Sequence, residues 1–319
     1  MFFDWLLLIV GMALLIKGAD FFVDGASGIA KKFGIPSLII GLTLVSLGTS
    51  APEISISINA VLDGASDMSV GNVVGSNICN IFLILGISAI FTPLIISKDV
   101  KKIDIPIMLG IFLSLVVFSF VLTPNRIDWY EGLILLASFV GYTILLIYRA
   151  KTTDDEQDDH EEKKINIVKC IIFVVLGLVA IVYGGDLVVD HARNIALTLG
   201  MSETLVSLTI VAVGTSLPEL VTSAVAAFKK EGDIAIGNVI GSCIFNIILI
   251  LGLASVVAPL GAANVLTVQS AIIFDVLVMI AGGLAMIAIS LFSKKFNRWQ
   301  GILFLVIYIA YILYIVIRN

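Results

Sequence analysis

The chain is 319 residues long, 59% of its residues are hydrophobic, 13% are charged, and its mean hydropathy is +1.12. A soluble domain cannot bury that much apolar surface, so the composition predicts a multi-pass membrane protein. The net charge of −5 comes without a basic patch interleaved with aromatic residues, which argues against a nucleic-acid partner.

Apolar runs of about 20 residues, each long enough to cross a bilayer as a helix, can be placed ten times along the chain. They lie near residues 3–24, 37–62, 69–95, 103–123, 128–149, 165–189, 203–228, 234–259, 268–292 and 297–317. The first run has no basic region before it and no cleavage site after it, so we expect a span and not a removed signal peptide. The sequence therefore predicts an all-α membrane protein with about ten transmembrane helices.

The positions of the basic residues predict how these helices are oriented. With the N-terminus outside, the inner side collects 15 Lys and Arg and the outer side three. The inner set is Lys31, Lys32, Lys98, Lys101, Lys102, Arg149, Lys151, Lys163, Lys164, Lys169, Lys229, Lys230, Lys294, Lys295 and Arg298, and the outer set is Arg126, Arg193 and Arg318. Basic loops stay in the cytoplasm. We therefore expect a multi-pass protein of the cell membrane with both termini outside.

The chain repeats itself at an offset of 166 residues. Residues 41–57 match residues 207–223 at nine of 17 positions, and residues 70–86 match residues 236–252 at 12 of 17. Each copy belongs to a set of five spans, and an odd number makes the second copy enter the membrane from the opposite side. This arrangement predicts an inverted repeat, which many secondary transporters use to build a midplane site between their halves.

The predicted domains follow from this repeat. They are a first five-helix repeat over residues 1–150, an acidic cytoplasmic linker over residues 151–164 and a second five-helix repeat over residues 165–319. The acidic run from Asp154 to Glu162 indicates a solvated linker. It lacks the central glycine and the spacing of an EF-hand loop, so it gives only weak support for calcium sensing.

Two matching hexads, Gly48-Thr49-Ser50-Ala51-Pro52-Glu53 and Gly214-Thr215-Ser216-Leu217-Pro218-Glu219, lie inside apolar runs. A proline and an ionisable carboxylate are both costly at bilayer depth, and intramembrane acids are functional by default. Each proline also removes the amide that would bond to the carbonyl four residues earlier. In lipid that oxygen must be satisfied, and a bound cation is one way to satisfy it.

Further oxygen-bearing side chains recur around the hexads. On a helix, Ser46, Thr49, Ser50, Glu53 and Ser57 share one face, and the second copy presents Ala212, Thr215, Ser216, Glu219 and Ser223. The second repeated segment adds Asn72, Ser76 and Asn80, matched by Asn238, Ser242 and Asn246. Such an all-oxygen set suits a hard cation, and Ca²⁺ takes about 6–8 oxygens. Two glutamates also balance its charge.

The other candidate ligand residues do not indicate a second metal site. The two histidines make a His-based transition-metal site improbable, and Cys79, Cys170 and Cys243 fall in apolar spans as small core residues. The acidic pairs Asp20/Asp24 and Asp186/Asp190 lie near span ends, where we expect helix caps or vestibule contacts. We expect no enzymatic activity, no catalytic residue and no cofactor.

The paired GTS-x-PE hexads and GN-V-x-GS-x-I-x-N segments resemble the two alpha-repeats of the cation/calcium exchanger superfamily, specifically the sodium/calcium exchangers. The resemblance covers nearly the whole chain. It implies that Glu53, Glu219 and the Thr49 and Thr215 carbonyls hold Ca²⁺. It implies that Na⁺ uses the same carboxylates with Ser50, Ser76, Ser216, Ser242 and the backbone of Ala212 or Ser46, and that Asn80 and Asn246 line the centre.

The resemblance also bears on the coupling ion. The proton-coupled branch usually lacks the proline before the glutamate, so Pro52 and Pro218 favour Na⁺. An Asp at position 246 would resemble the potassium-dependent exchangers and some archaeal relatives. Asn246 therefore argues against K⁺ cotransport. We therefore expect an antiporter that exchanges Ca²⁺ for Na⁺ across the lipid bilayer by alternating access. An H⁺/Ca²⁺ antiporter with the same glutamate pair is the alternative.

Two other classes of function fit the residues less well. An ion channel would need a continuous pore, which symmetry-related hexads sealed at the midplane fit poorly. An intramembrane hydrolase could use two acids, but the paired Ser, Thr and Asn stripes would then have no purpose.

Overall fold

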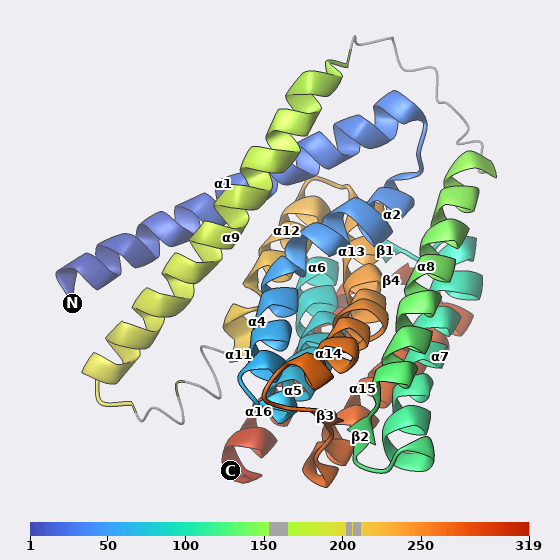
Figure 1. The fold of residues 1–319 in the computed structure, drawn as a ribbon. Helices are drawn as coiled ribbons and strands as arrows, with labels where there is room; N and C mark the ends of the chain where they lie inside the picture. The colour runs from blue at the N-terminus through green and yellow to red at the C-terminus, as the bar shows by residue number, and fades with distance from the viewer. Residues whose placement is uncertain (153–164, 202–205, 207–211, 319) are drawn as a thin grey trace.

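The computed structural model describes residues 1–152, 165–201, 206 and 212–318, and helices dominate the described chain (Figure 1). Eight of its helical segments are long and apolar enough to cross a membrane. They are Phe2–Phe33, Ser66–Phe91, Val100–Leu122, Trp129–Thr152, Ile167–Thr198, Gly232–Leu260, Ser270–Phe292 and Arg298–Arg318. A ninth span is a pair of helices, Ser37–Thr49 and Ala51–Leu62, that is bent by 46° at residue 50.

Several of these spans are composed of consecutive helical elements. The first half contains α1 (Phe2–Phe33), α2 (Ser37–Ile40), η1 (Gly41–Val45), α3 (Ser46–Thr49), α4 (Ala51–Leu62), α5 (Ser66–Ile78), η2 (Cys79–Ile84), α6 (Leu85–Phe91), η3 (Val100–Asp104), α7 (Ile105–Val116), η4 (Val117–Leu122) and α8 (Trp129–Thr152). The second half contains α9 (Ile167–Thr198), α11 (Ala212–Gly214), α12 (Leu217–Phe228), α13 (Gly232–Phe245), η6 (Asn246–Leu251), α14 (Gly252–Val257), η7 (Ala258–Leu260), η8 (Ser270–Ile272), α15 (Ile273–Phe292) and α16 (Arg298–Arg318).

Nine of the ten predicted spans correspond to these segments. The remaining one, near residues 203–228, lies partly outside the described residues, so the count of ten stays a prediction. The predicted first span was too short, because α1 continues past its apolar stretch to Phe33. It ends at Gly34, whose left-handed φ of 63° is a conformation that glycine adopts without steric cost. The acidic linker also lies outside the described residues except for its first two positions.

The first helices of the two halves form a crossed pair beside the other helices (Figure 1). Helices α1 and α9 are each 32 residues long and pack against each other. Their backbones approach closely where Gly18 faces Gly177, since a Cβ built on Gly18 would lie 2.9 Å from the Gly177 carbonyl oxygen. Glycine has no side chain, so two helix backbones can approach each other this closely.

Two short antiparallel ribbons connect loops of different halves. Strand β1 (Leu94–Ile95) pairs with β4 (Lys295–Phe296), and β2 (Arg126–Ile127) pairs with β3 (Leu266–Thr267). The sequence places the two loops of the first ribbon on the inner side and the two loops of the second on the outer side. Each ribbon thus joins two loops that share a side in the predicted orientation.

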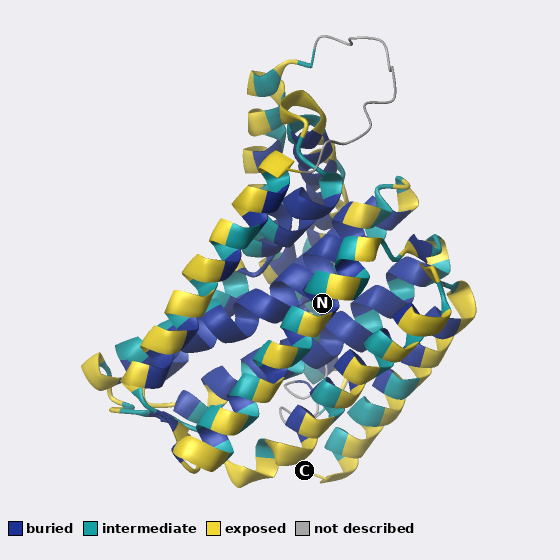
Figure 2. Ribbon diagram, turned by 90° about the vertical axis from the view of Figure 1, so that its right-hand side faces the viewer, coloured by how far each residue is buried: buried dark blue, intermediate teal, exposed yellow. Residues whose placement is uncertain are grey.

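Burial divides the spans into a central pair and a surrounding layer (Figure 2). In the most apolar 18-residue stretch of each span, 78% is buried in Ser66–Phe91 and 67% in Gly232–Leu260. The corresponding buried share is 22–33% in the other six unbroken spans. The surrounding helices expose apolar side chains such as Ile144, Val175 and Leu303, as lipid-facing helices do. The two central spans carry Ser76 with Asn80 and Ser242 with Asn246.

Accessibility labelling tests the predicted orientation. In a background without the three native cysteines, Lys151→Cys at the end of α8 should label only from the cytoplasm. Ala262→Cys should label only from outside, because it lies in the loop that contains β3. Both positions are exposed. The neighbouring Gly261 is unsuitable, since a Cβ there would lie 2.7 Å from the Leu62 Cα atom. If both cysteines label from one side, the ten-span topology is wrong.

Candidate cation site

Both hexads interrupt their helix at the same serine. Ser50 has φ −81° and ψ 8°, Ser216 has φ −88° and ψ 6°, and each precedes a new helix. Pro52 and Pro218 lie in the first turns of α4 and α12, where the missing amide costs no helical hydrogen bond. The expectation that Ser46 and Glu53 lie on one face of a continuous helix is therefore wrong, because the helix breaks between them.

The break places each glutamate at a helix N-terminus inside the protein. Glu53 and Glu219 lie in the first turns of α4 and α12, and each is only 1% exposed. The unpaired amides and the dipole of a helix N-terminus favour negative charge. The hexads thus supply two buried carboxylates in matched surroundings.

Two asparagines support these helix starts in the same way. Asn72 Nδ2 donates to the Ser57 hydroxyl (3.1 Å) and the Glu53 carbonyl oxygen (3.5 Å). Asn238 Nδ2 donates to the Ser223 hydroxyl (2.8 Å) and the Glu219 carbonyl oxygen (3.4 Å). The Asn238 Oδ1 in turn accepts a hydrogen bond from Thr49 Oγ1 (3.1 Å).

The roles of these two asparagines differ from the prediction. We expected Asn72 and Asn238 to be cation ligands. Both instead direct their amide nitrogens at the helices that carry the glutamates, and the Asn238 oxygen is already occupied. They hold the glutamate backbones in place.

Hydrogen bonds between the halves bring the predicted serine ligands together. Ser50 Oγ donates to Glu219 Oε1 (2.8 Å) and lies within hydrogen-bond distance of Ser242 Oγ (3.1 Å), whose hydroxyl can donate to it. In the matching contact, Ser216 Oγ donates to Ser76 Oγ (3.4 Å). The Ser50–Glu219 contact joins the two hexads, and each serine–serine contact joins the hexad of one half to the central span of the other half. Oxygens from both halves therefore line one site.

Four buried oxygen atoms around this site have no hydrogen-bond partner among the residues that the structure describes. They are Glu53 Oε2, Glu219 Oε2, Asn80 Oδ1 and Asn246 Oδ1. Asn80 and Asn246 occupy equivalent places in the π-helical segments η2 and η6, and π-helical segments often occur at functional sites. Buried acceptors without a donor are costly, and a cation satisfies them. Two carboxylates with neutral oxygens match the chemistry of Ca²⁺ or Na⁺.

The remaining predicted ligands surround this centre less directly. Ser46 and Thr49 are fully buried, and the Ser46 carbonyl accepts hydrogen bonds from the Ser50 amide (3.1 Å) and from Thr49 Oγ1 (3.4 Å). Thr215 is half-buried next to the break before α12. Only the backbone of Ala212 is described, in α11.

The acidic pairs outside the site have different surroundings. Lys229, directly after α12, lies 2.5 Å from an Asp20 carboxylate oxygen and 2.6 Å from one of Asp24. This arrangement, here called the Lys229 clasp, joins α1 to the α12–α13 turn. The equivalent acids of the second half, Asp186 and Asp190, are exposed on α9.

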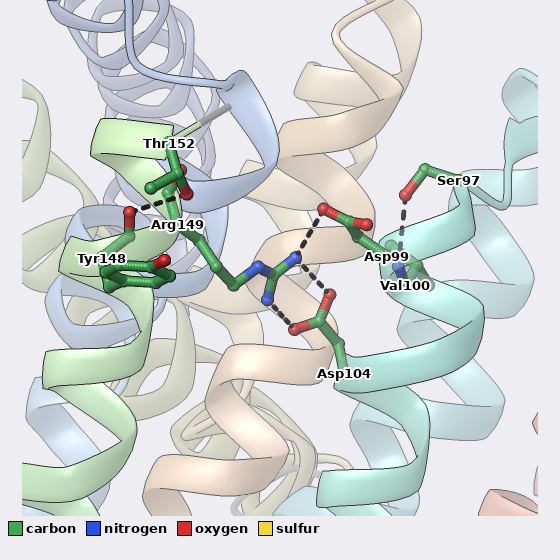
Figure 3. Close-up of polar contacts among 7 residues, drawn as sticks. All are labelled: Ser97, Asp99, Val100, Asp104, Tyr148, Arg149 and Thr152. Atoms are coloured by element: carbon green, nitrogen blue, oxygen red, sulfur yellow. Dashed lines mark hydrogen bonds and ion pairs between the residues drawn. The ribbon is translucent and has the colours of Figure 1, made fainter. Parts of the chain in front are cut away.

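A buried ion pair that the sequence did not predict ties η3 to α8 (Figure 3). The Arg149 guanidinium contacts both Asp104 carboxylate oxygens, at 2.6 and 3.2 Å, and Asp99 at 3.3 Å. In the second half, Asp275 on α15 pairs with Arg318 on α16 at 3.3 Å. No motif marks these pairs, because their acidic and basic partners lie more than 40 residues apart.

Known proteins match the chain over nearly its whole length. The model of the sodium/calcium exchanger protein family matches residues 3–148 and 169–317. The chain belongs to the sodium/calcium exchanger family. It is 35% identical to the sodium/calcium exchanger MaX1 of Methanosarcina acetivorans over 97% of both chains, and 37% identical to the putative antiporter CaxA of Alkalimonas amylolytica over 95% of both.

A solved structure gives the same assignment for the fold. The sodium-calcium exchanger NCX_Mj, in a crystal soaked with Na⁺ and Sr²⁺, superposes with a TM-score of 0.83 at 33% identity and covers 97% of both chains. The all-α membrane fold and the family predicted from the hexads are thereby confirmed. Each of the two segments that the family model matches includes one hexad, and residues 149–168, which contain the acidic linker, lie between them.

Proposed function

We propose that this chain exchanges Ca²⁺ for Na⁺ across the membrane by alternating access. The observation that carries the proposal is the set of four buried, unpartnered oxygens, two from each half, around the contact between Ser50 and Glu219. Ca²⁺ would draw on both glutamates, which together balance its charge. Na⁺ would occupy the same carboxylates together with the serines, so the two ions would compete for one set of ligands.

The division of the site between the halves supports alternating access. Ser50 of the first half contacts Glu219 and Ser242 of the second half, and Ser216 of the second half contacts Ser76 of the first. A movement of one half relative to the other would therefore open the site to one side at a time. Inverted repeats commonly build such a site at the midplane. The names of the relatives MaX1 and NCX_Mj point to the same pair of ions.

Flux measurements test this proposal. Purified protein in proteoliposomes should take up Ca²⁺ when a Na⁺ gradient is imposed, and should not do so when a K⁺ gradient replaces it. Uptake that follows a pH gradient and ignores Na⁺ would replace the proposal with H⁺/Ca²⁺ antiport. Ca²⁺ movement without any counter-ion gradient would indicate a channel.

The serine ligands separate Na⁺ from H⁺ coupling. Na⁺ needs neutral oxygens as well as carboxylates, whereas a proton needs only a carboxylate. Ser76→Ala or Ser242→Ala should therefore raise the Na⁺ concentration for half-maximal Ca²⁺ flux by about threefold to tenfold, the effect of losing one ordinary polar contact. Ca²⁺ affinity in Na⁺-free buffer should change less.

Ser255→Ala is the matched control for these variants. Ser255 is equally buried, and its hydroxyl donates to the Leu251 carbonyl oxygen within its own span (2.6 Å). This variant should keep the Na⁺ dependence of the wild type. Equal shifts in all three variants would mean that Ser76 and Ser242 act through packing and not as ligands.

A further inference from the structure

Asn77 is a fully buried amide beside the site, and comparison of the two halves does not select it. It lies near the end of α5. Its Oδ1 accepts a hydrogen bond from Asn246 Nδ2 (3.0 Å), and its own Nδ2 donates to the Cys243 carbonyl oxygen (3.2 Å). Its Nδ2 also lies 3.5 Å from Met279 Sδ on α15.

These contacts determine the orientation of two amides in turn. A backbone carbonyl only accepts hydrogen bonds, so the Asn77 arm that faces Cys243 must be its nitrogen, and its oxygen faces Asn246. That oxygen accepts from the Asn246 nitrogen, which leaves the Asn246 oxygen on the other arm. This second oxygen is the buried Oδ1 without a partner. The Cys243 carbonyl thus fixes Asn77, and Asn77 fixes Asn246.

The two halves differ at this position. The residue equivalent to Asn77 in the second half is Cys243, which contributes no amide oxygen, and a thiol is only a weak acceptor. Cys243 Sγ instead points toward the Asn77 carbonyl oxygen (3.9 Å). Asn80, the counterpart of Asn246, therefore cannot be held by an amide in the same way.

We propose that Asn77 is a positioning residue that turns the oxygen of Asn246 toward the transported cations. An amide serves a cation only through its oxygen, so the wrong orientation would present two N–H groups to a positive charge. The inference rests on the proposed function and deepens it, because it assigns part of the Ca²⁺ affinity to a residue that does not touch the ion.

The test removes the Asn77 oxygen and measures Ca²⁺ binding directly. Asn77→Leu should weaken equilibrium Ca²⁺ binding to detergent-purified protein in Na⁺-free buffer by about fivefold to fiftyfold, the effect of leaving one buried polar group unpaired. Met279→Leu is the control for packing, because it changes the neighbour of Asn77 without touching Asn246. It should keep Ca²⁺ affinity within about twofold of the wild type, a difference of less than 0.5 kcal/mol.

A second background separates positioning from structure. In Asn246→Ala, the amide oxygen that Asn77 would orient is absent, so adding Asn77→Leu should change Ca²⁺ affinity by less than about twofold. Equal losses in both backgrounds would overturn the inference. So would unchanged Ca²⁺ affinity in the folded Asn77→Leu protein. If the leucine variant does not fold, Asn77→Ala removes the same oxygen and gives the same comparison.

The outcome for the proposed function is read separately, from flux. A wild type that binds Ca²⁺ without Na⁺-driven flux would refute Na⁺/Ca²⁺ exchange, and the binding comparison would still decide the role of Asn77. A wild type that binds no Ca²⁺ would overturn both.

Discussion

Replacing either site glutamate by glutamine should abolish Ca²⁺ transport. Glu53→Gln or Glu219→Gln preserves side-chain volume but leaves a bound Ca²⁺ with one compensating carboxylate. Removing one partner of a buried charge pair costs roughly 3–5 kcal/mol. Since about 1.4 kcal/mol is a tenfold change in affinity, Ca²⁺ binding should weaken by at least about a hundredfold. Equilibrium Ca²⁺ binding and Na⁺-driven flux, measured on protein of wild-type thermal stability, check this result.

The chain offers a matched control for this change. Glu131 is also almost completely buried, and its Oε1 likewise has no partner among the described residues, but its Oε2 accepts from Thr123 Oγ1 (2.7 Å) and the Asp128 amide (2.9 Å) at the start of α8. In the second half, Gln300 accepts from the Asn297 amide in the same way (2.7 Å). Glu131→Gln should therefore be accommodated and keep Ca²⁺ affinity. Full transport by Glu53→Gln or Glu219→Gln would show that the site is elsewhere.

The largest loss of stability is expected for Arg149→Leu. The guanidinium is the partner of the fully buried Asp104, and its removal leaves that carboxylate uncompensated. The expected cost is about 3–5 kcal/mol, seen as a lower melting temperature in detergent. The double variant Arg149→Leu with Asp104→Leu should recover most of this loss, because no unpaired charge remains.

Arg318→Leu is the comparison for this stability change. Arg318 forms the corresponding pair with Asp275, but its side chain is 30% exposed and the pair has one contact of 3.3 Å. Partly exposed pairs contribute about 1 kcal/mol or less. If Arg149→Leu and Arg318→Leu lower the melting temperature equally, burial does not determine the cost, and the argument fails.

The repeated parts of the sequence were sufficient to predict the fold, and they select the residues of the candidate site. Apolar runs of spanning length are a strong signal, and two identical costly features, a proline and a glutamate, recur at one offset. Ser50, Ser76, Ser216 and Ser242 were selected by this repetition, and hydrogen bonds join them in the structure.

Features that depend on packing could not be predicted in this way. Spacing alone does not show whether an amide directs its nitrogen or its oxygen at a site, so Asn72 and Asn238 were expected to be ligands. Asn77 was missed because the two halves differ there, and a self-comparison discards what is not repeated. The one signal available was a third amide in the same apolar span as Asn72 and Asn80.

The Lys229 clasp breaks the equivalence of the two halves. In an antiporter with two identical inverted halves, a two-fold axis in the membrane plane would relate the inward-open and outward-open states, which would then have equal free energy. Lys229 binds Asp20 and Asp24 at one end of the crossed pair α1–α9, whereas the residue equivalent to Lys229 is Asp63, which cannot bind Asp186 and Asp190. Among the described residues, Asp186 and Asp190 have no lysine in the place of Lys229, so in such an antiporter the clasp should favour the conformation in which it is closed and make the resting populations of the unloaded protein unequal.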